Sequence, residues 1–300
     1  MYNMKMRIPF LRRIFFMHVL AASFLFAGEI HPKSFPTWVE PTEPFQIAGP
    51  LYYVGTRGLA VYLIKTNAGL ILLNGAMPES KDLIHQSIRK LGFKLEDIRL
   101  ILVSHAHIDH VGTISESKKL SHAPVAVLEF EVDLLKSGGK HDYLFGEKAD
   151  MQFEGVTADR VLKDGEKVIL GEVELIPHWT PGHTKGCTTW ETSITEKGKK
   201  YSVIFADGTS VNPGTRLVKK VSYPQIANDY KKTFQTLESL HPDIFLSYHA
   251  EFFDLEKKRA RMAKEGINAW VDPKGYQELI KTKKKEFEEK VAAEKSLSAQ

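Results

Sequence analysis

Three histidines and an aspartate lie within six residues of this sequence, at His105, His107, Asp109 and His110. On a loop that leaves a strand, side chains two residues apart point the same way, so His105 and His107 can converge. Asp109 and His110 can face a second point close by. Imidazole and carboxylate groups suit zinc, which takes such ligands at ~2.0–2.2 Å. Burying these groups unpaired is costly, and a metal ion removes that cost. The run therefore predicts a metal site.

Two later histidines follow predicted strands in a similar way. His183 lies in a turn rich in glycine and proline, and His249 follows a short apolar strand. Loops at one edge of a sheet commonly build a site together. We assign one zinc ion to His105, His107 and His183, and a second zinc ion to Asp109, His110 and His249. Three protein ligands for each ion leave a coordination position open, which favours catalysis over a closed structural site.

The other histidines and the single cysteine have simpler interpretations. We expect solvation for His31, His85, His122, His141 and His241. His178 has a weaker pattern for metal binding than the six residues above. Cys187 has no second cysteine with which to form an internal disulfide. It is expected to be a packed thiol, with a zinc thiolate as the alternative.

The elements that position these side chains read as an α/β protein. Apolar runs predict strands at 51–54, 60–64, 70–73, 100–103, 168–170, 173–176, 201–205 and 243–247. Apolar residues at helical spacing predict helices at 83–91 and about 225–240. Both halves run from strands to a helix to a strand, which suits two sheets packed between helices. The charged segment 276–300 is expected to form a solvated helix.

The N-terminus has the pattern of an export signal. Residues 1–28 carry four basic residues and no acid, and include an apolar run of fourteen residues. That run is shorter than the roughly 20 residues of a membrane-spanning helix. We expect 1–28 to be a cleaved signal peptide and 29–300 to be one domain, beginning with an extended arm at 29–46. The mature protein is then periplasmic and free of the membrane.

Net charge excludes one class of partner. The formal net charge is +4, and the four basic residues of 1–28 account for all of it. The rest of the chain therefore has no basic excess that would indicate nucleic-acid binding. We expect a small-molecule substrate and a monomer.

The motifs together resemble the metallo-β-lactamase superfamily. The matching segments are Ser-His-Ala-His-Ile-Asp-His at 104–110, Thr-Pro-Gly-His-Thr-Lys-Gly at 180–186, and the late His249. The opening at 44–56 and the segment 182–190 resemble subclass B3 more specifically. The similarity runs from about residue 37 to 276. It implies a four-layer αβ/βα sandwich, with two mixed sheets flanked by helices and the metals at one edge.

The resemblance also implies a function and site roles. It points to a zinc-dependent β-lactamase that hydrolyses the amide bond of penicillins, cephalosporins and carbapenems through a zinc-bound hydroxide. Asp109 would orient the nucleophile and accept its proton. Ser210 and Thr209 would contact the substrate, and Trp38 and residues 137–143 would flank the groove. The alternatives are a thioesterase or lactonase of the same superfamily, similar to glyoxalase II, and a non-enzymatic zinc-binding module.

Three positions depart from the family pattern. Asn74 stands where the family often has aspartate, and Gly208 stands where subclass B3 commonly has serine. Many hydrolases of the superfamily have a metal-bridging residue near Asp207. The subclass B3 pattern gives that aspartate a structural role, and the sequence leaves both roles open.

Overall fold

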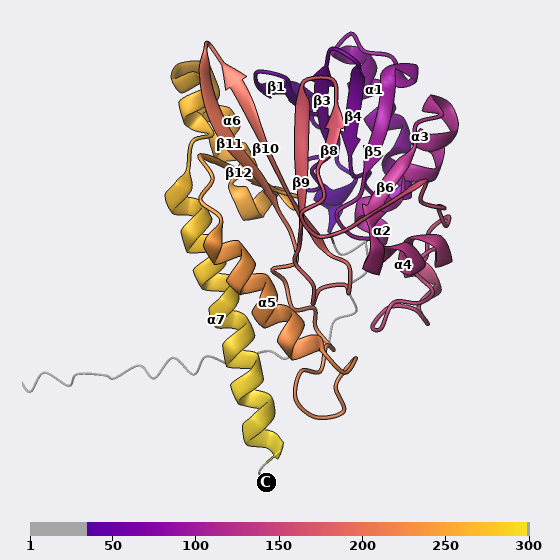
Figure 1. Ribbon diagram of the computed structural model, residues 1–300, viewed down its shortest axis with the longest axis vertical. Coiled ribbons are helices and arrows are strands. Elements are labelled where there is room, and N and C mark those ends of the chain that lie inside the picture. The colour runs from indigo at the N-terminus through magenta and orange to yellow at the C-terminus, as the bar shows by residue number, and fades with distance from the viewer. Residues whose placement is uncertain (1–34, 299–300) are drawn as a thin grey trace, which may run out of the picture.

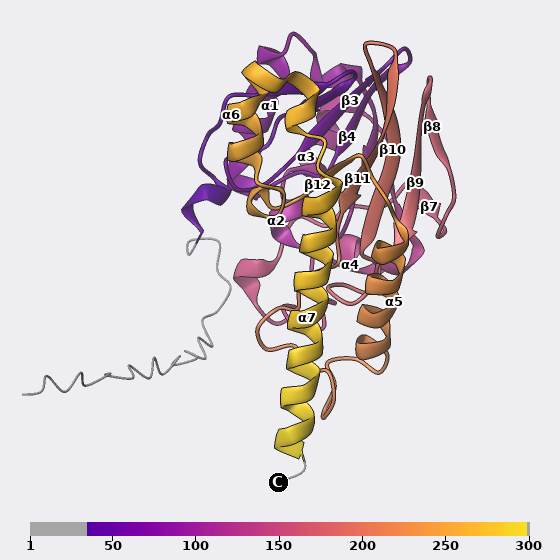
Figure 2. The same ribbon diagram turned by 90° about the vertical axis from the view of Figure 1, so that its left-hand side faces the viewer.

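Two β-sheets packed face to face form the centre of the computed structural model, which describes residues 35–298. Helices cover the outer face of each sheet (Figures 1 and 2). The order of layers is helix, sheet, sheet, helix, which confirms the predicted αβ/βα sandwich. The predicted signal peptide at 1–28 lies outside the described residues.

The first sheet has seven strands in sequential order. They are β1 (Phe45–Ala48), β2 (Leu51–Tyr53), β3 (Tyr62–Thr66), β4 (Gly69–Leu73), β5 (Ile98–Leu102), β6 (Val125–Leu128) and β7 (Arg160–Leu162). Strands β1 to β4 pair antiparallel, and β4 to β7 pair parallel. The sheet is therefore mixed, as predicted. Parallel strands covered on both faces read as continuous apolar runs, as β6 does.

The second sheet has five strands in the order β12-β11-β10-β9-β8. They are β8 (Val168–Leu170), β9 (Val173–Trp179), β10 (Thr188–Glu196), β11 (Lys199–Ala206) and β12 (Ile244–Ser247). Strand β12 pairs parallel with β11, and the other pairs are antiparallel. As a result β9, β11 and β12 all end at one edge, where the loops after them gather.

Seven α-helices flank the sheets within the described part of the chain. They are α1 (Lys81–Lys90), α2 (Ile108–Val111), α3 (Ile114–Ser121), α4 (Val132–Ser137), α5 (Ile226–Ser239), α6 (Leu255–Glu265) and α7 (Pro273–Ser298). One apolar cluster joins α1 and α3 to the outer face of the first sheet. A larger cluster fills the space between the sheets and continues beneath α5 and α7. None of the described helices is long and apolar enough to cross a membrane.

The C-terminal helix differs from its expected role as a purely solvated element. Tyr276, Ile280 and Phe287 of α7 are buried in the larger cluster, and the Phe287 ring stacks on Tyr230 of α5. Apolar residues spaced along α7 therefore form a narrow packed face. In the sequence this face is hard to recognise, because many lysines and glutamates lie between its residues. The end of α7 projects beyond the body of the protein (Figure 1).

The N-terminal arm also differs from the expected extended segment. Its described part contains a short 3-10 helix, η2 (Pro36–Trp38), and the start of β1. The Trp38 side chain is buried. The Thr56 hydroxyl donates a hydrogen bond to the Trp38 carbonyl oxygen at 2.9 Å, which fixes this segment to the body.

Candidate metal centre

The His-x-His run lies directly after β5, at the edge where strands of both sheets end. His105 and His107 lie in the loop between β5 and α2. The Asn74 side chain holds this loop: its Oδ1 accepts from the Ser104 amide and its Nδ2 donates to Ser104 Oγ, both at 2.8 Å. Asn74 has a φ of 64°, a left-handed conformation that asparagine tolerates. Ser104 thus anchors the loop through its backbone amide and its hydroxyl oxygen.

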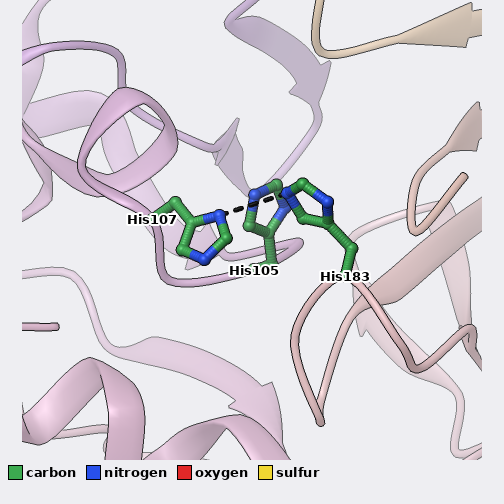
Figure 3. A group of neighbouring side chains, drawn as sticks. All are labelled: His105, His107 and His183. Carbon is green, nitrogen blue, oxygen red and sulfur yellow. Dashed lines mark hydrogen bonds between the residues drawn. The ribbon is translucent and has the colours of Figure 1, made fainter. Parts of the chain in front are cut away.

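His105, His107 and His183 converge as one group, called here the three-histidine group. Their ligand atoms all lie within 4.8 Å of one another. Each pair of rings has its centroids 4.8 Å apart, and Nδ1 of His107 lies 3.1 Å from Nε2 of His183. Figure 3 shows the three rings pointing toward one another, with His183 arriving from a separate loop. The structure therefore brings together the residues predicted for the first ion.

Two buried carboxylates lie behind two of these rings. Asp207 Oδ2 lies 2.7 Å from Nδ1 of His105, and Asp142 Oδ2 lies 3.1 Å from Nε2 of His107. Burial acts to raise the pKa of Asp207, but His105 lowers it well below the usual range. A histidine that donates one N–H to a carboxylate keeps its other nitrogen free for a metal. His105 is thereby prepared to bind through Nε2, and His107 through Nδ1.

A backbone carbonyl has the same role at the third ring. Nδ1 of His183 lies 2.9 Å from the Ser210 carbonyl oxygen, which leaves Nε2 to face the group. The Tyr230 hydroxyl donates to the same oxygen at 2.8 Å. Each ring of the three-histidine group is thus oriented by an oxygen behind it.

Asp109, His110 and His249 form the second group, called here the aspartate group. Asp109 Oδ2 lies 3.1 Å from Nε2 of His110 and 3.6 Å from Nε2 of His249. The His249 ring contacts those of His110, Trp38 and Phe252, at centroid distances of 5.0, 5.4 and 5.3 Å. The rings of His105 and His110 are 4.2 Å apart, so the two groups adjoin.

Orphaned nitrogen atoms show that these groups fit metal ions. Nε2 of His105 and Nε2 of His110 are buried, and neither has a hydrogen-bond partner. Asp109 Oδ2 lies within ion-pair distance of Nε2 of His110 but forms no hydrogen bond with it. Buried polar nitrogens without partners are costly, and a divalent metal satisfies them. Imidazole with carboxylate is also the donor set that zinc prefers.

The pKa shifts favour ligand-competent protonation states. Burial lowers the pKa of His183 and of His249 to about 4, so both are neutral at pH 7. Burial acts to raise the pKa of Asp109, but the neighbouring His110 lowers it well below the usual range. His107 is the exception: burial acts to lower its pKa, but Asp142 raises it above the usual value, so a metal must displace a proton that this ring holds more readily.

A cavity opens above both groups. Its wall is mainly aromatic and apolar, and its polar members include residues of both groups. The lining consists of Phe35, Trp38, His107, Asp109, Phe145, Met151, His183, Ser210, Asn212, His249, Glu251 and Phe252. Trp38 and Ser210 were predicted from the sequence to contact the substrate, and both line this cavity. Thr209 is 5% exposed and is not part of the lining.

Several residues of the site escaped the sequence analysis. Phe145 and Met151 line the cavity, whereas no residue of 137–143, the loop expected to flank it, is part of the lining. Asn212 and Glu251 line it as well, and Asp142 orients His107 from behind. Glu251 lies two residues after His249, a nearness that could have suggested it. Asp142 has no local pattern that marks it.

The structure explains why glycine occupies position 208. Its φ is 81°, in the left-handed region, and an added Cβ would lie 2.3 Å from the Thr180 carbonyl oxygen. Its amide donates to Asp207 Oδ1 at 2.8 Å. With His105 on the other oxygen, both oxygens of Asp207 are engaged by the protein, which supports the structural role for this aspartate.

Within the described residues, the remaining candidates lie away from both groups except Cys187. His31 lies outside the described residues. The expectation of solvation is wrong for His85, which is 5% exposed on the buried face of α1. His178 pairs with Glu191 at 2.7 Å. Cys187 is fully buried, as expected of a packed thiol. Its sulfur lies close enough to His105 and Asp207 to form a third possible ligand group.

Comparison with known proteins assigns the family. The family model "Metallo-beta-lactamase superfamily" matches residues 54–249. The chain belongs to the metallo-beta-lactamase superfamily.

Solved structures refine the assignment. The native FEZ-1 metallo-beta-lactamase from Legionella gormanii is 42% identical, with a TM-score of 0.83 over 85% of this chain and 98% of that one. The class B3 di-zinc metallo-beta-lactamase LRA-12 from an Alaskan soil metagenome is 36% identical, with a TM-score of 0.81 over 85% and 97%. The predicted likeness to subclass B3 is therefore confirmed. A more distant relative is an N-acyl homoserine lactonase of Bacillus thuringiensis, 23% identical over 69% of this chain and 85% of its own length.

Proposed function

We propose that this protein is a zinc-dependent β-lactamase that opens the lactam amide bond of penicillins, cephalosporins and carbapenems. The observation that carries the proposal is the pair of adjoining ligand groups beneath one apolar cavity. Similarity to a class B3 di-zinc metallo-beta-lactamase supports two zinc ions. His105, His107 and His183 would hold one ion, and Asp109, His110 and His249 the other.

The bound zinc and Asp109 would have different roles in the reaction. Zinc, when bound, lowers the pKa of a coordinated water to around 7 and polarises a carbonyl oxygen. Asp109 faces the cavity beside His110 and His249, where its carboxylate can orient the attacking water and accept a proton. The water oxygen bonds to the lactam carbon, the C–N bond breaks, and the nitrogen receives the proton. No covalent bond to the protein forms.

The cavity walls would hold the rest of the substrate. Ser210 lines the cavity, so its hydroxyl is our candidate contact for the substrate carboxylate. The side chain of Thr209 is mostly buried beside it, and a contact to substrate there requires a small rearrangement. Trp38 offers an aromatic face next to His249. We propose that these three residues bind the substrate.

We also propose that residues 1–28 direct export to the periplasm and that the mature protein is a monomer. The basic, apolar and small residues of that segment support export.

A lactonase is the second candidate because an N-acyl homoserine lactonase is among the relatives. A lactone carbonyl could occupy the same place above the two groups. The 42% identity to a metallo-beta-lactamase, against 23% to the lactonase, favours the lactam. Protein donors engage both Asp207 oxygens, which disfavours Asp207 as the bridging ligand that the thioesterase pattern would need.

One experiment tests the proposal. Purified mature protein would be assayed with a carbapenem, an N-acyl homoserine lactone and a thioester, before and after treatment with a chelator. We expect carbapenem hydrolysis that the chelator removes and added Zn²⁺ restores. Turnover of the lactone or thioester alone would contradict the lactamase assignment, and activity that resists chelation would contradict the metal.

A further inference from the structure

Glu131 is a carboxylate that the proposed reaction does not use, and it is completely buried. It lies at the end of the 3-10 helix η5 (Glu129–Glu131), which follows β6 of the first sheet. Within residues 35–298 no lysine or arginine forms an ion pair with it. Burial raises the pKa of Glu131 to about 7, against hydrogen bonds that lower it. A residue that is this costly to bury needs strong compensating contacts.

Those contacts come from the two loops that carry the three-histidine group. Oε1 of Glu131 accepts a hydrogen bond from the Ala106 amide at 2.6 Å. Oε2 accepts from the Thr184 hydroxyl and from the Gly186 amide, both at 2.8 Å. Ala106 lies between His105 and His107, and Thr184 directly follows His183. One side chain therefore joins the loop of the first sheet to the loop of the second.

Packing strengthens the same connection. A Cβ added to Gly186 would lie 2.3 Å from the Glu131 backbone nitrogen. Only glycine allows the loop to approach η5 this closely. The 180–186 turn is thus held against η5, and the same two loops are joined a second time by the Thr188 amide, which donates to the Ser104 carbonyl oxygen at 2.8 Å. The three rings come from two loops, one that follows β5 of the first sheet and one that follows β9 of the second.

We propose that Glu131 is a positioning residue that fixes His183 relative to His105 and His107 and thereby sets the metal affinity of the three-histidine group. This proposal rests on the proposed function in one respect: it requires that the site bind metal. It does not depend on which substrate is hydrolysed. Its role differs from those of Asp142 and Asp207, because it contacts no ring and holds the backbone instead.

The substitution Glu131→Gln tests this with almost no change in shape. A glutamine amide would turn an N–H group toward either the Ala106 amide or the Thr184 and Gly186 donors, so at least one bond is lost. Outer contacts of metal ligands change affinity by about 10–100-fold. We expect one of the two Zn²⁺ binding events, measured by competition with a chromophoric chelator, to weaken about ten- to a hundredfold. The other event should change less.

Cobalt provides a readout that a general loss of stability would not move. With Co²⁺ in place of Zn²⁺, Glu131→Gln should alter the visible absorption of the metal bound to the three-histidine group. Thr192→Val is the matched control, because it removes a buried hydrogen bond to the Glu174 carbonyl within the second sheet. It should leave both affinities and the cobalt spectrum unchanged.

A second variant keeps the test decisive if Glu131→Gln does not fold. Thr184→Val removes one of the three donors and should weaken the same binding event severalfold. The proposal is overturned if folded Glu131→Gln keeps both affinities within twofold and an unchanged spectrum. It is also overturned if Thr192→Val has an equal effect, or if Thr184→Val has none when Glu131→Gln cannot be made. A wild type that binds both metals but leaves lactams intact would contradict the proposed function alone.

Discussion

The two ligand groups adjoin, yet the protein supports them differently. In the three-histidine group each ring has an oxygen behind it, from Asp207, Asp142 or the Ser210 backbone. In the aspartate group, Asp109 pairs with both His110 and His249, and the His249 ring otherwise packs on the rings of Trp38 and Phe252. The His249 side chain is 18% exposed, against 1% for His105. We infer that the three-histidine group is the more rigid and binds its metal more tightly.

The largest effect is expected in the aspartate group, because Asp109 is both a candidate ligand and the candidate proton acceptor. Asp109→Asn should lower kcat by about 10²–10⁴-fold, the range for loss of a general base. Steady-state kinetics and metal analysis measure the two roles separately. Asp159→Asn is the control, since that carboxylate pairs with Lys118 of α3 and does not line the cavity. Undiminished kcat in Asp109→Asn would remove Asp109 from the mechanism.

Asp207→Asn should act mainly on the three-histidine group. The Asn amide would present N–H to Nδ1 of His105, which then favours a proton on Nε2, the atom meant for the metal. We expect metal affinity and kcat/KM to fall by about 10–100-fold. Glu191→Gln makes the same change behind His178, outside the site, and should have no effect. If Asp207→Asn weakened only the other metal, the comparison of the two groups would be wrong.

Gly208 is expected to affect stability through the turn that holds Asp207. Gly208 and Gly198 share a φ of 81°, but only Gly208 has a neighbour that a Cβ would meet. Both Gly→Ser variants carry a backbone cost of about 1–2 kcal/mol. Gly208→Ser should lose a further ~1–3 kcal/mol because Thr180 must move. Urea unfolding measures the difference, and equal losses would show that the turn accommodates serine.

Trp38 lies beside the aspartate group and is expected to affect substrate binding. Its ring lies beside His249 in the cavity wall. Trp38→Ala should raise KM about three- to tenfold, which corresponds to roughly 1 kcal/mol of binding. Phe93→Ala, which removes a ring packed on Tyr52 outside the cavity, should leave KM unchanged. An unchanged KM in Trp38→Ala for every substrate would mean that the arm only packs.

The candidate metal ligands could be predicted from the sequence, but the carboxylates that orient them could not. His105, His107, Asp109 and His110 are contiguous, so their spacing alone indicated a metal site. His183 and His249 were found because each follows a strand, and strand ends meet at one edge. Asp207 lies 102 residues from His105, and Asp142 lies 35 from His107. Such outer contacts depend on how loops fold over one another, which no local pattern encodes.

The same distinction holds for the fold. Runs such as β4 and β12 were predicted because nearly full burial makes a strand continuously apolar. Strands β1, β6, β7 and β10 were not predicted. In β10, threonines and a glutamate interrupt the apolar pattern, whereas β6 is a fully buried apolar run of four residues that was overlooked. The packed face of α7 was also missed, because sparse apolar residues lie among many charged ones. Tertiary packing, rather than local propensity, determines those elements.

The most direct test is a zinc titration of chelator-treated protein, followed at once by metal analysis and carbapenem hydrolysis. The account predicts that activity disappears without metal and returns as two Zn²⁺ ions bind in sequence, the first more tightly than the second. Asp207→Asn should weaken the first event and Asp109→Asn the second. Hydrolysis by metal-free protein, or a single binding event that involves both groups, would contradict it.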